Sequence, residues 1–305
     1  MSGSASYPEL TQAISWLALG FCVPEDWEIV RHGIGFERGS LVFVDRVRQR
    51  LSVSWTACPR APDLERLLSD FGNQPLTVGE KVLDQQDHSG FRVLECETQI
   101  GDHVTHALCF DPLSKRLIEL ELPAAGAPHD ALAPALLASF TFAQPEHGQR
   151  VRAFGVHAEV PEGFRLSASQ VKPADVNLEF ERSARRGERS AERLRIRRSG
   201  MARTWFGGDA ARSIRLRRPE LRFHDFRPAA VGPHTAVVAR GYPRGAILQR
   251  AFGLVAPRSV TLWECPEQNA VFETEVCVPR GQDANSAELS VWCCAGHAKE
   301  ARHGG

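Results

Sequence analysis

Hydrophobic and polar residues alternate in many short segments of this chain, a period of two that is typical of strands with one buried face. In the first half, segments 41–44 and 51–55 alternate and are rich in β-branched and aromatic residues, so they predict a β-hairpin. Further strands are expected at 20–24, 27–30, 91–97, 103–110 and 116–122.

Two segments of the first half have helical spacing instead. Between Pro62 and Gly72 the leucines recur at intervals of three and four residues, with proline placed early and glycine at the end. Segment 130–139 also places its leucines on one side. Strands combined with helices that pack against them predict the α+β class.

The second half repeats this order of elements. A helix is expected over 202–214, interrupted by Gly207-Gly208. The predicted fold class is therefore α+β, with two tandem diverged copies of an antiparallel sheet flanked by helices. Strands of the second copy are expected at 154–160, 176–180, 194–198, 221–226, 235–240, 247–254 and 260–264, followed by an ending at 269–276.

Direct sequence matches indicate a duplication. Residues 23–29 (VPEDWEI) recur as 160–166 (VPEGFRL), and 50–53 (RLSV) match 193–196 (RLRI). The larger offset of the second match implies an insertion within 182–190, and at that offset 117–123 falls on 260–266. The predicted organisation is an acidic copy one at 1–143, a linker at 144–150, a basic copy two with a longer hairpin at 151–280, and a tail at 281–305.

This pattern resembles a known superfamily. A strand that ends in Val-Pro-x-x-Trp/Phe, a hairpin, a helix, a meander and the closing segment 136–140 (LLASF) are similar to PsbP-like domains. That superfamily includes a photosystem accessory subunit, a Ran-binding nuclear import factor and the Eag chaperones of type VI secretion. The resemblance implies a non-catalytic adaptor or accessory protein. Copy two lacks a clean Leu-Leu-x-Ser-Phe ending, which leaves the closure of its sheet open.

Charged residues are distributed unevenly along the chain. The 305 residues carry 37 Lys+Arg and 37 Asp+Glu, so the net charge is zero. Residues 1–149 hold 11 basic and 20 acidic residues, and 150–305 hold 26 and 17, which gives −9 and +9. Such an imbalance favours an anionic partner, and the two halves also have the charges to neutralise each other within one chain or between copies.

An arginine-rich face is the strongest candidate site. In 193–197 (RLRIR) the period of two puts two apolar residues on one face and three arginines on the other. A solvated outer face explains this pattern, and so does binding of another protein with an acidic surface; nucleic acid or an anionic ligand is the alternative. The candidate partner-binding residues are Arg182, Arg185, Arg186, Arg189, Arg193, Arg195, Arg197, Arg215 and Arg217.

A metal site is a third possibility. Cys293, Cys294 and His297 offer thiolate and imidazole ligands, with Cys265 and Cys277 upstream, but the paired CxxC spacing of common zinc sites is absent. We therefore expect no cofactor, with a metal-dependent enzyme that uses this tail as an alternative.

Other features favour a non-enzymatic protein. The sequence contains no G-x-S-x-G elbow, P-loop or dinucleotide fingerprint. It also contains no apolar run long enough to span a membrane and no signal-peptide pattern, and its eight cysteines are irregularly spaced. We expect an adaptor or accessory subunit with buried thiols, a cytoplasmic location and no enzymatic activity.

Overall fold

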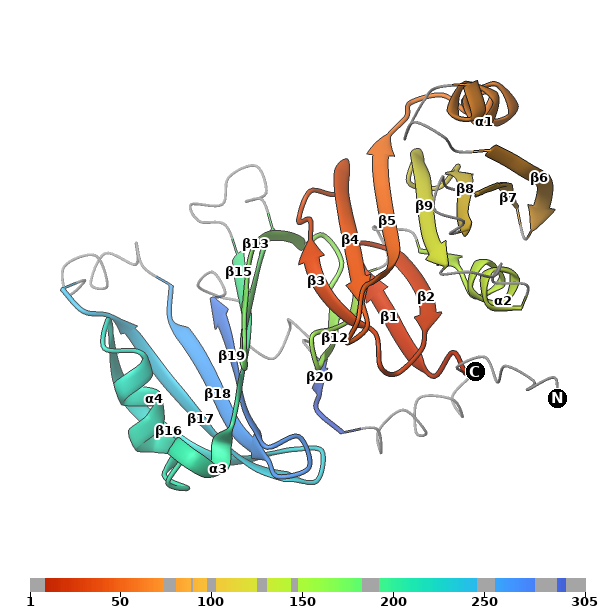
Figure 1. Ribbon diagram of the computed structural model, residues 1–305. Helices are drawn as coiled ribbons and strands as arrows, with labels where there is room; N and C mark the ends of the chain where they lie inside the picture. Colours follow the sequence, from red (N-terminus) through yellow and green to blue (C-terminus); the bar gives the residue numbers. More distant parts are fainter. Residues whose placement is uncertain are drawn as a thin grey trace, which may run out of the picture. The chain divides into compact units, whose positions relative to one another are not determined.

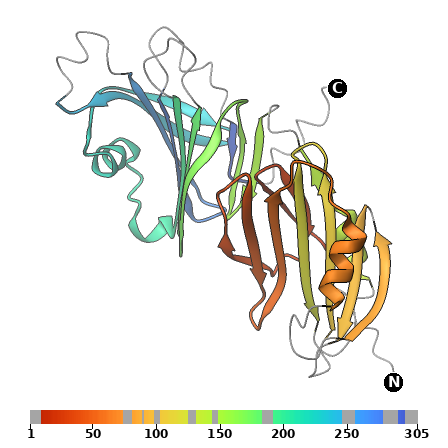
Figure 2. The ribbon, with the colours of Figure 1, turned by 90° about the horizontal axis from the view of Figure 1, so that it is seen from above.

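The computed structural model describes residues 9–73, 81–88, 90–97, 103–124, 131–143, 148–182, 192–245, 256–277 and 290–294. The chain forms two compact units, residues 1–145 (unit 1) and 146–305 (unit 2), each built around an antiparallel sheet (Figures 1 and 2). Among the described residues, no helix is long and apolar enough to cross a membrane.

Unit 1 contains a seven-stranded antiparallel sheet in the order β3-β4-β5-β9-β8-β7-β6. Before it, a hairpin of β1 (Gln12–Trp16) and β2 (Leu19–Val23) pairs with the short β10 (Thr141–Phe142). The strands of the sheet are β3 (Glu28–His32), β4 (Arg38–Val44), β5 (Gln49–Ala57), β6 (Lys81–His88), β7 (Phe91–Glu97), β8 (His103–Asp111) and β9 (Arg116–Ala124).

The core of unit 1 follows from alternation along these strands. On β5, Leu51, Val53 and Trp55 are buried, and the serines between them face the other side of the sheet. The Trp55 Nε1–H donates to the Gly35 carbonyl at 2.9 Å, which satisfies the polar edge of a buried ring. Helix α1 (Leu64–Asn73) packs Leu68 against β7 and β8, and α2 (Leu132–Ala138) buries Leu136.

Unit 2 contains a seven-stranded antiparallel sheet in the order β13-β14-β15-β19-β18-β17-β16. A hairpin of β11 (Gln149–Ala153) and β12 (Val156–Val160) precedes it, and β20 (Ser290–Trp292) pairs with β12. The strands of the sheet are β13 (Arg165–Lys172), β14 (Asp175–Arg182), β15 (Glu192–Gly200), β16 (Leu221–Val231), β17 (His234–Pro243), β18 (Arg258–Cys265) and β19 (Ala270–Cys277).

Two short helices of unit 2 cover one part of this sheet. Helix α3 (Ala202–Trp205) and helix α4 (Ala210–Arg217) bury Ala202 and Ile214 against apolar residues of β16 to β19. The Asp209 side chain accepts from the Arg212 backbone N–H at 2.8 Å and caps α4. On the same face, β14 and β15 carry charged residues instead of apolar ones, so the helices stop where the polar surface begins.

The two units share one topology. The strand orders of their seven-stranded sheets correspond one to one, and each hairpin receives a third strand on its second member. The hairpin turns also match, since Leu17-Ala18 and Phe154-Gly155 both have two successive positive φ angles. However, β9 corresponds to β19, so the sequence match of 117–123 with 260–266 is one strand out of register.

The predicted α+β class is wrong. Strands hold 61 % of the described residues, and the four helices described are too short to form a layer that flanks the sheets. Strands β1, β6, β10, β11 and β13 were not predicted from the sequence. The sequences of β6 (KVLDQQDH) and β13 (RLSASQVK) are rich in polar residues and show little apolar alternation. Strand β11 begins within the expected linker 144–150. The expected strand at 247–254 lies outside the described residues, as do 183–191, 278–289 and 295–305.

Candidate binding face and cysteine cluster of unit 2

A face of alternating charge lies on the same side of the unit 2 sheet as α3 and α4, and it extends from the end of α4 to strands that these helices leave uncovered. Its side chains come from every second residue of adjacent strands, because alternate residues of a strand share one face. The register places Glu179 opposite Arg195, and Arg195 opposite Glu275. We call this surface the ionic face; it comprises Asp175, Asn177, Glu179, Glu181, Arg193, Arg195, Arg197, Arg258, Glu273 and Glu275.

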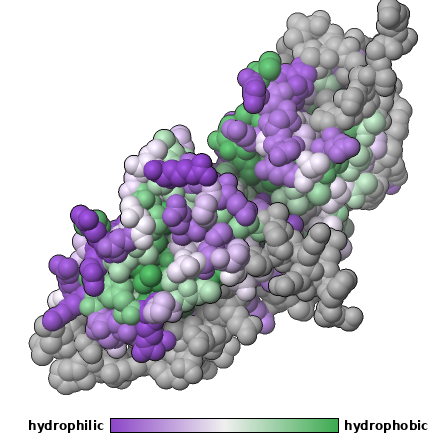
Figure 3. Space-filling view, turned by 90° about the horizontal axis from the view of Figure 1, so that it is seen from below, coloured by the Kyte–Doolittle hydropathy of each residue, from purple (hydrophilic) through white to green (hydrophobic). Residues whose placement is uncertain are grey.

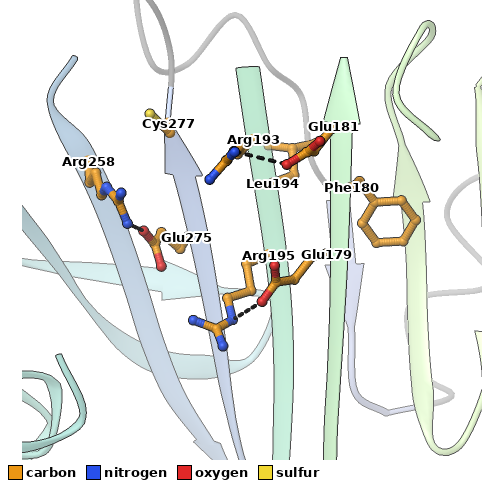
Figure 4. Close-up of a pocket in the computed structure, with 9 residues that line it drawn as sticks. All are labelled: Glu179, Phe180, Glu181, Arg193, Leu194, Arg195, Arg258, Glu275 and Cys277. Atoms are coloured by element: carbon orange, nitrogen blue, oxygen red, sulfur yellow. Dashed lines mark hydrogen bonds and ion pairs between the residues drawn. The ribbon is translucent and has the colours of Figure 1, made fainter. Parts of the chain in front are cut away.

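The outer part of the ionic face is a ladder of exposed ion pairs between β14 and β15. Arg193 pairs with Glu181 at 3.0 Å, and Arg195 pairs with Glu179 at 3.2 Å (Figure 4). The Arg193 side chain is 65 % exposed, so it is the arginine of the ladder that a partner can reach most easily. These side chains line a shallow pocket of about 170 Å³ together with Arg258, Glu275 and Cys277.

The ion pair of Asp175 with Arg197 is held by more hydrogen bonds than the two outer pairs. Arg197 donates to both oxygens of the Asp175 carboxylate, at 3.0 and 3.1 Å, and the Ser199 hydroxyl donates to it at 2.9 Å. Burial acts to raise the pKa of Asp175, but the hydrogen bonds from Arg197 and Ser199 outweigh it, and the pKa is lowered. The hydrogen bond to Asp175 raises the pKa of Arg197. Both groups are therefore ionised at neutral pH.

The inner part of the ionic face is buried. Glu273, only 1 % exposed, accepts from Arg217 at 2.9 Å and pairs closely with Arg218. Glu275 pairs with Arg218 at 3.2 Å and with Arg258 at 2.6 Å. The end of α4, together with Arg258 of β18, thus supplies the cations that neutralise the carboxylates of β19. Burial lowers the pKa of Arg217, and the charge of Glu273 opposes that shift.

Unit 1 carries no such ladder at the corresponding positions. Ser52 and Ser54 of β5 correspond to Arg195 and Arg197, while Glu119 of β9 corresponds to Glu273. Glu119 accepts from the Ser54 hydroxyl at 3.3 Å instead of from a guanidinium. Arginines at these strand positions therefore account for part of the charge difference between the two halves.

An exposed apolar rim adjoins the ionic face. Met201 and Trp205 lie four residues apart across α3, with 57 % and 43 % exposure, and Leu216 of α4 is 70 % exposed. These are three of the seven large hydrophobic residues that are exposed in the described part of the chain. The Arg217 guanidinium lies 5.4 Å from the centre of the Trp205 ring and links this rim to Glu273. On the surface shown in Figure 3, hydrophilic and hydrophobic residues are interspersed.

The predicted arginines are thus dispersed over several environments. Arg193, Arg195 and Arg197 lie on the ionic face, whereas Arg182 pairs with Glu192 and covers the Phe164 ring. Arg215 and Arg217 belong to α4 and not to a strand of the sheet. Arg185, Arg186 and Arg189 lie outside the described residues.

The other members of the ionic face were not predicted from the sequence: Asp175, Asn177, Glu179, Glu181, Arg258, Glu273 and Glu275. Arg218, which pairs with Glu273 and Glu275, was not predicted either. The alternation of carboxylates at 273 and 275 was a signal for the acidic members.

A second candidate site is a cluster of three cysteines and one histidine. Cys294 Sγ lies 3.6 Å from Cys293 Sγ, 3.7 Å from Cys265 Sγ and 2.8 Å from His234 Nε2. All four ligand atoms lie within 4.8 Å of one another. Burial raises the pKa of the Cys293 and Cys294 thiols, which keeps them protonated in the absence of a cation. We call this group the cysteine cluster.

The cysteine cluster only partly matches the predicted metal ligands. Cys293, Cys294 and Cys265 are brought together, but Cys277 lies elsewhere, on β19, and His297 lies outside the described residues. His234 was missed, because nothing in its local sequence marks it as a ligand. No disulfide joins any of the eight cysteines, all of which belong to the described part of the chain.

No protein-family model and no curated protein matches the sequence. Among solved structures, the apo immunity protein TplEi of the T6SS from Pseudomonas aeruginosa is 10 % identical, with a TM-score of 0.35 and 89 % of each chain covered. TplEi complexed with "L" peptide is 11 % identical, with a TM-score of 0.33 and 90 % of each chain covered. The Tle4-Tli4 complex gives 10 % identity and a TM-score of 0.34, covering 89 % of this chain and 87 % of that one.

Structural similarities with TM-scores this low do not assign a fold family or a function to this chain. The similarity to PsbP-like domains is not confirmed by them and stays a prediction.

Proposed function

We propose that this chain is a non-enzymatic adaptor or accessory protein that holds another protein on the ionic face and the adjoining rim of unit 2. The observation that carries the proposal is the ordered ladder of arginines and carboxylates beside the exposed Trp205. Tryptophan and arginine are the residues that most often dominate the energy of protein interfaces.

The arrangement of charges on the ionic face restricts which partner surfaces can bind to it. Because Glu179, Glu181 and Asp175 already neutralise their arginines in part, the face presents alternating signs and not a uniform positive field. A partner must therefore match both signs in register, which gives specificity more than raw affinity. Acidic side chains of the partner would be directed at Arg193, the most exposed guanidinium of the ladder.

The first step of the test is to capture a partner at a defined position. A photo-reactive amino acid placed at Trp205, in the chain expressed in its native host, should cross-link a protein that the same substitution at Leu113 of unit 1 does not capture. Leu113 is the matched control, since its exposure of 51 % is close to that of Trp205.

The second step uses the purified partner. Arg193→Glu should weaken the complex about tenfold or more and reduce the salt dependence of binding. Arg150→Glu is the matched control: Arg150 is also an exposed arginine of unit 2, 72 % exposed and paired with Glu159, but it belongs to β11. Equal affinities for the wild type and Arg193→Glu would contradict the proposal.

The alternative of a nucleic-acid or anionic-ligand protein makes a different prediction. It requires affinity for generic polyanions with a steep salt dependence. The described arginines of the ladder face carboxylates, and a polyanion would have to displace these from their guanidinium groups.

A reducing compartment such as the cytoplasm remains part of our proposal, supported by eight cysteines without a disulfide.

A further inference from the structure

The cysteine cluster is assembled from three separate parts of unit 2. His234 begins β17, Cys265 ends β18, and Cys293 and Cys294 directly follow β20. Cys265 and Cys293 are 0 % and 1 % exposed, and Cys294 is 9 % exposed. Three buried thiols and one half-buried imidazole thus converge from distant segments, and both are ligand types that zinc prefers.

We infer that the cysteine cluster is a zinc site with a Cys3His ligand set. Thiolates that each lie ~2.3 Å from a tetrahedral zinc ion are ~3.8 Å apart. The observed separations of Cys294 Sγ from Cys293 Sγ and Cys265 Sγ are 3.6 and 3.7 Å. His234 Nε2 is hydrogen-bonded to Cys294 Sγ at 2.8 Å, and the ion takes the place of the shared proton.

The surroundings suit a bound cation with three thiolates. The Trp263 indole N–H points at Cys293 Sγ, at 3.4 Å, as a donor to a sulfur ligand should. Zinc with three thiolates and a neutral imidazole carries one net negative charge, and Arg198 supplies a nearby positive one. Arg198 Nε donates to Gln268 Oε1 at 3.3 Å, and the Gln268 amide donates to the Cys293 carbonyl.

The number of ligands indicates the kind of site. Four protein ligands leave no open position on a tetrahedral ion, which is typical of a structural site and not of a catalytic one. The zinc would fasten β20 to the ends of β17 and β18.

Metal content tests the inference directly. The full-length chain, purified with a thiol reductant and without chelator from zinc-supplemented cells, should contain about one zinc ion per molecule by elemental analysis. Cys294→Ala and His234→Ala should each lower this content at least several-fold. Cys277→Ala is the matched control, since it removes another thiol of unit 2 outside the cluster and should leave the zinc content unchanged.

A second measurement covers the case in which these variants fail to fold. The reduced, metal-free wild type titrated with Co²⁺ should develop the thiolate-to-cobalt charge-transfer band and the intense visible bands of a tetrahedral sulfur-rich site, and Zn²⁺ should abolish them. Wild-type protein that contains no zinc and gives no such bands after full reduction would overturn the inference. Zinc content unaffected in folded Cys294→Ala would overturn it as well.

Discussion

Asp111 of unit 1 and Cys265 of unit 2 occupy the same position in their units. Each is the last residue of its strand, β8 or β18, and each is followed by a four-residue turn that starts with proline. Both turns end in a residue with positive φ, Lys115 at 52° and Asn269 at 47°. A buried carboxylate in one unit is thus replaced by a thiol of the cysteine cluster in the other.

The carboxylate of unit 1 is matched by a buried arginine. Arg116 lies opposite Asp111 in the register, and the Ser114 hydroxyl between them donates to Asp111 and accepts from Arg116 Nε at 2.7 Å. Burial lowers the pKa of Arg116 to about 10, with Asp111 acting against the shift, so the side chain stays charged at neutral pH.

We predict that Arg116→Met lowers the free energy of unfolding of unit 1 by roughly 3–5 kcal/mol, because it leaves a buried carboxylate without its cation. Urea denaturation combined with amide hydrogen exchange in β8 and β9 measures this loss. Arg150→Met, which breaks an exposed pair, should cost less than about 1 kcal/mol. Equal losses in the two variants would show that burial of Arg116 has no such effect.

Glu273 and Glu119 allow the buried part of the ionic face to be tested with a matched pair. We predict that Glu273→Gln destabilises unit 2 by roughly 3 kcal/mol, because Arg217 and Arg218 then lose the charge that neutralises them. Glu119→Gln, at the corresponding position of unit 1, loses only a hydrogen bond from Ser54 and should cost about 1 kcal/mol or less. Hydrogen exchange of β19 and β9 measures both, and the reverse order of losses would be inconsistent with this account.

The lowered pKa of Asp175 predicts an acid-dependent loss of stability. An aspartate whose folded-state pKa lies below its unfolded value near 4 contributes stability that is fully present above about pH 4 and is lost as the pH falls through the folded-state value. Asp175→Asn should cost roughly 1–2 kcal/mol at pH 7 and should flatten the stability profile of unit 2 below pH 4. Denaturation curves over this pH range measure the effect, and a variant profile parallel to that of the wild type would refute it.

Gly39 is predicted to be intolerant of any side chain. A Cβ at this position would lie 2.4 Å from Cζ2 of the Trp55 ring, which is only 1 % exposed. Gly39→Ala should therefore cost roughly 1–3 kcal/mol in thermal or urea unfolding. Gly207→Ala, where an added Cβ meets nothing within 4 Å, should change the stability by less than about 0.5 kcal/mol. Similar stabilities of the two variants would contradict the close contact with Trp55.

The local pattern of apolar residues was sufficient to predict those helices and strands in which apolar residues recur at a regular interval. The hairpin of β4 and β5 was predicted from alternation, and α1 from leucines three and four residues apart, because both periods reflect a single buried face. The same reasoning failed for β13, whose sequence RLSASQVK contains few apolar residues. Such a strand is held by its hydrogen-bonded neighbour β14, which a local window does not contain.

The candidate sites depend on contacts between distant segments. Alternation placed Arg195 and Arg197 on one face of a strand, as the structure does, but their carboxylate partners follow from the register with β14 and β19. Likewise, His234 and Cys294 are 60 residues apart and meet only through the arrangement of the sheet. His234 has no local signature in the sequence, and the alternating carboxylates of β19 do not by themselves indicate which arginines they pair with.

The strand β20 has a consequence for biosynthesis. It pairs with β12, so Trp292 lies opposite His157, a residue that leaves the ribosome long before it. In unit 1 the corresponding strand comes earlier, because β10, at Thr141 and Phe142, pairs with β2. The strand that pairs with β2 therefore leaves the ribosome before most of unit 2, whereas β12 stays unpaired on the corresponding side until β20 has been synthesised.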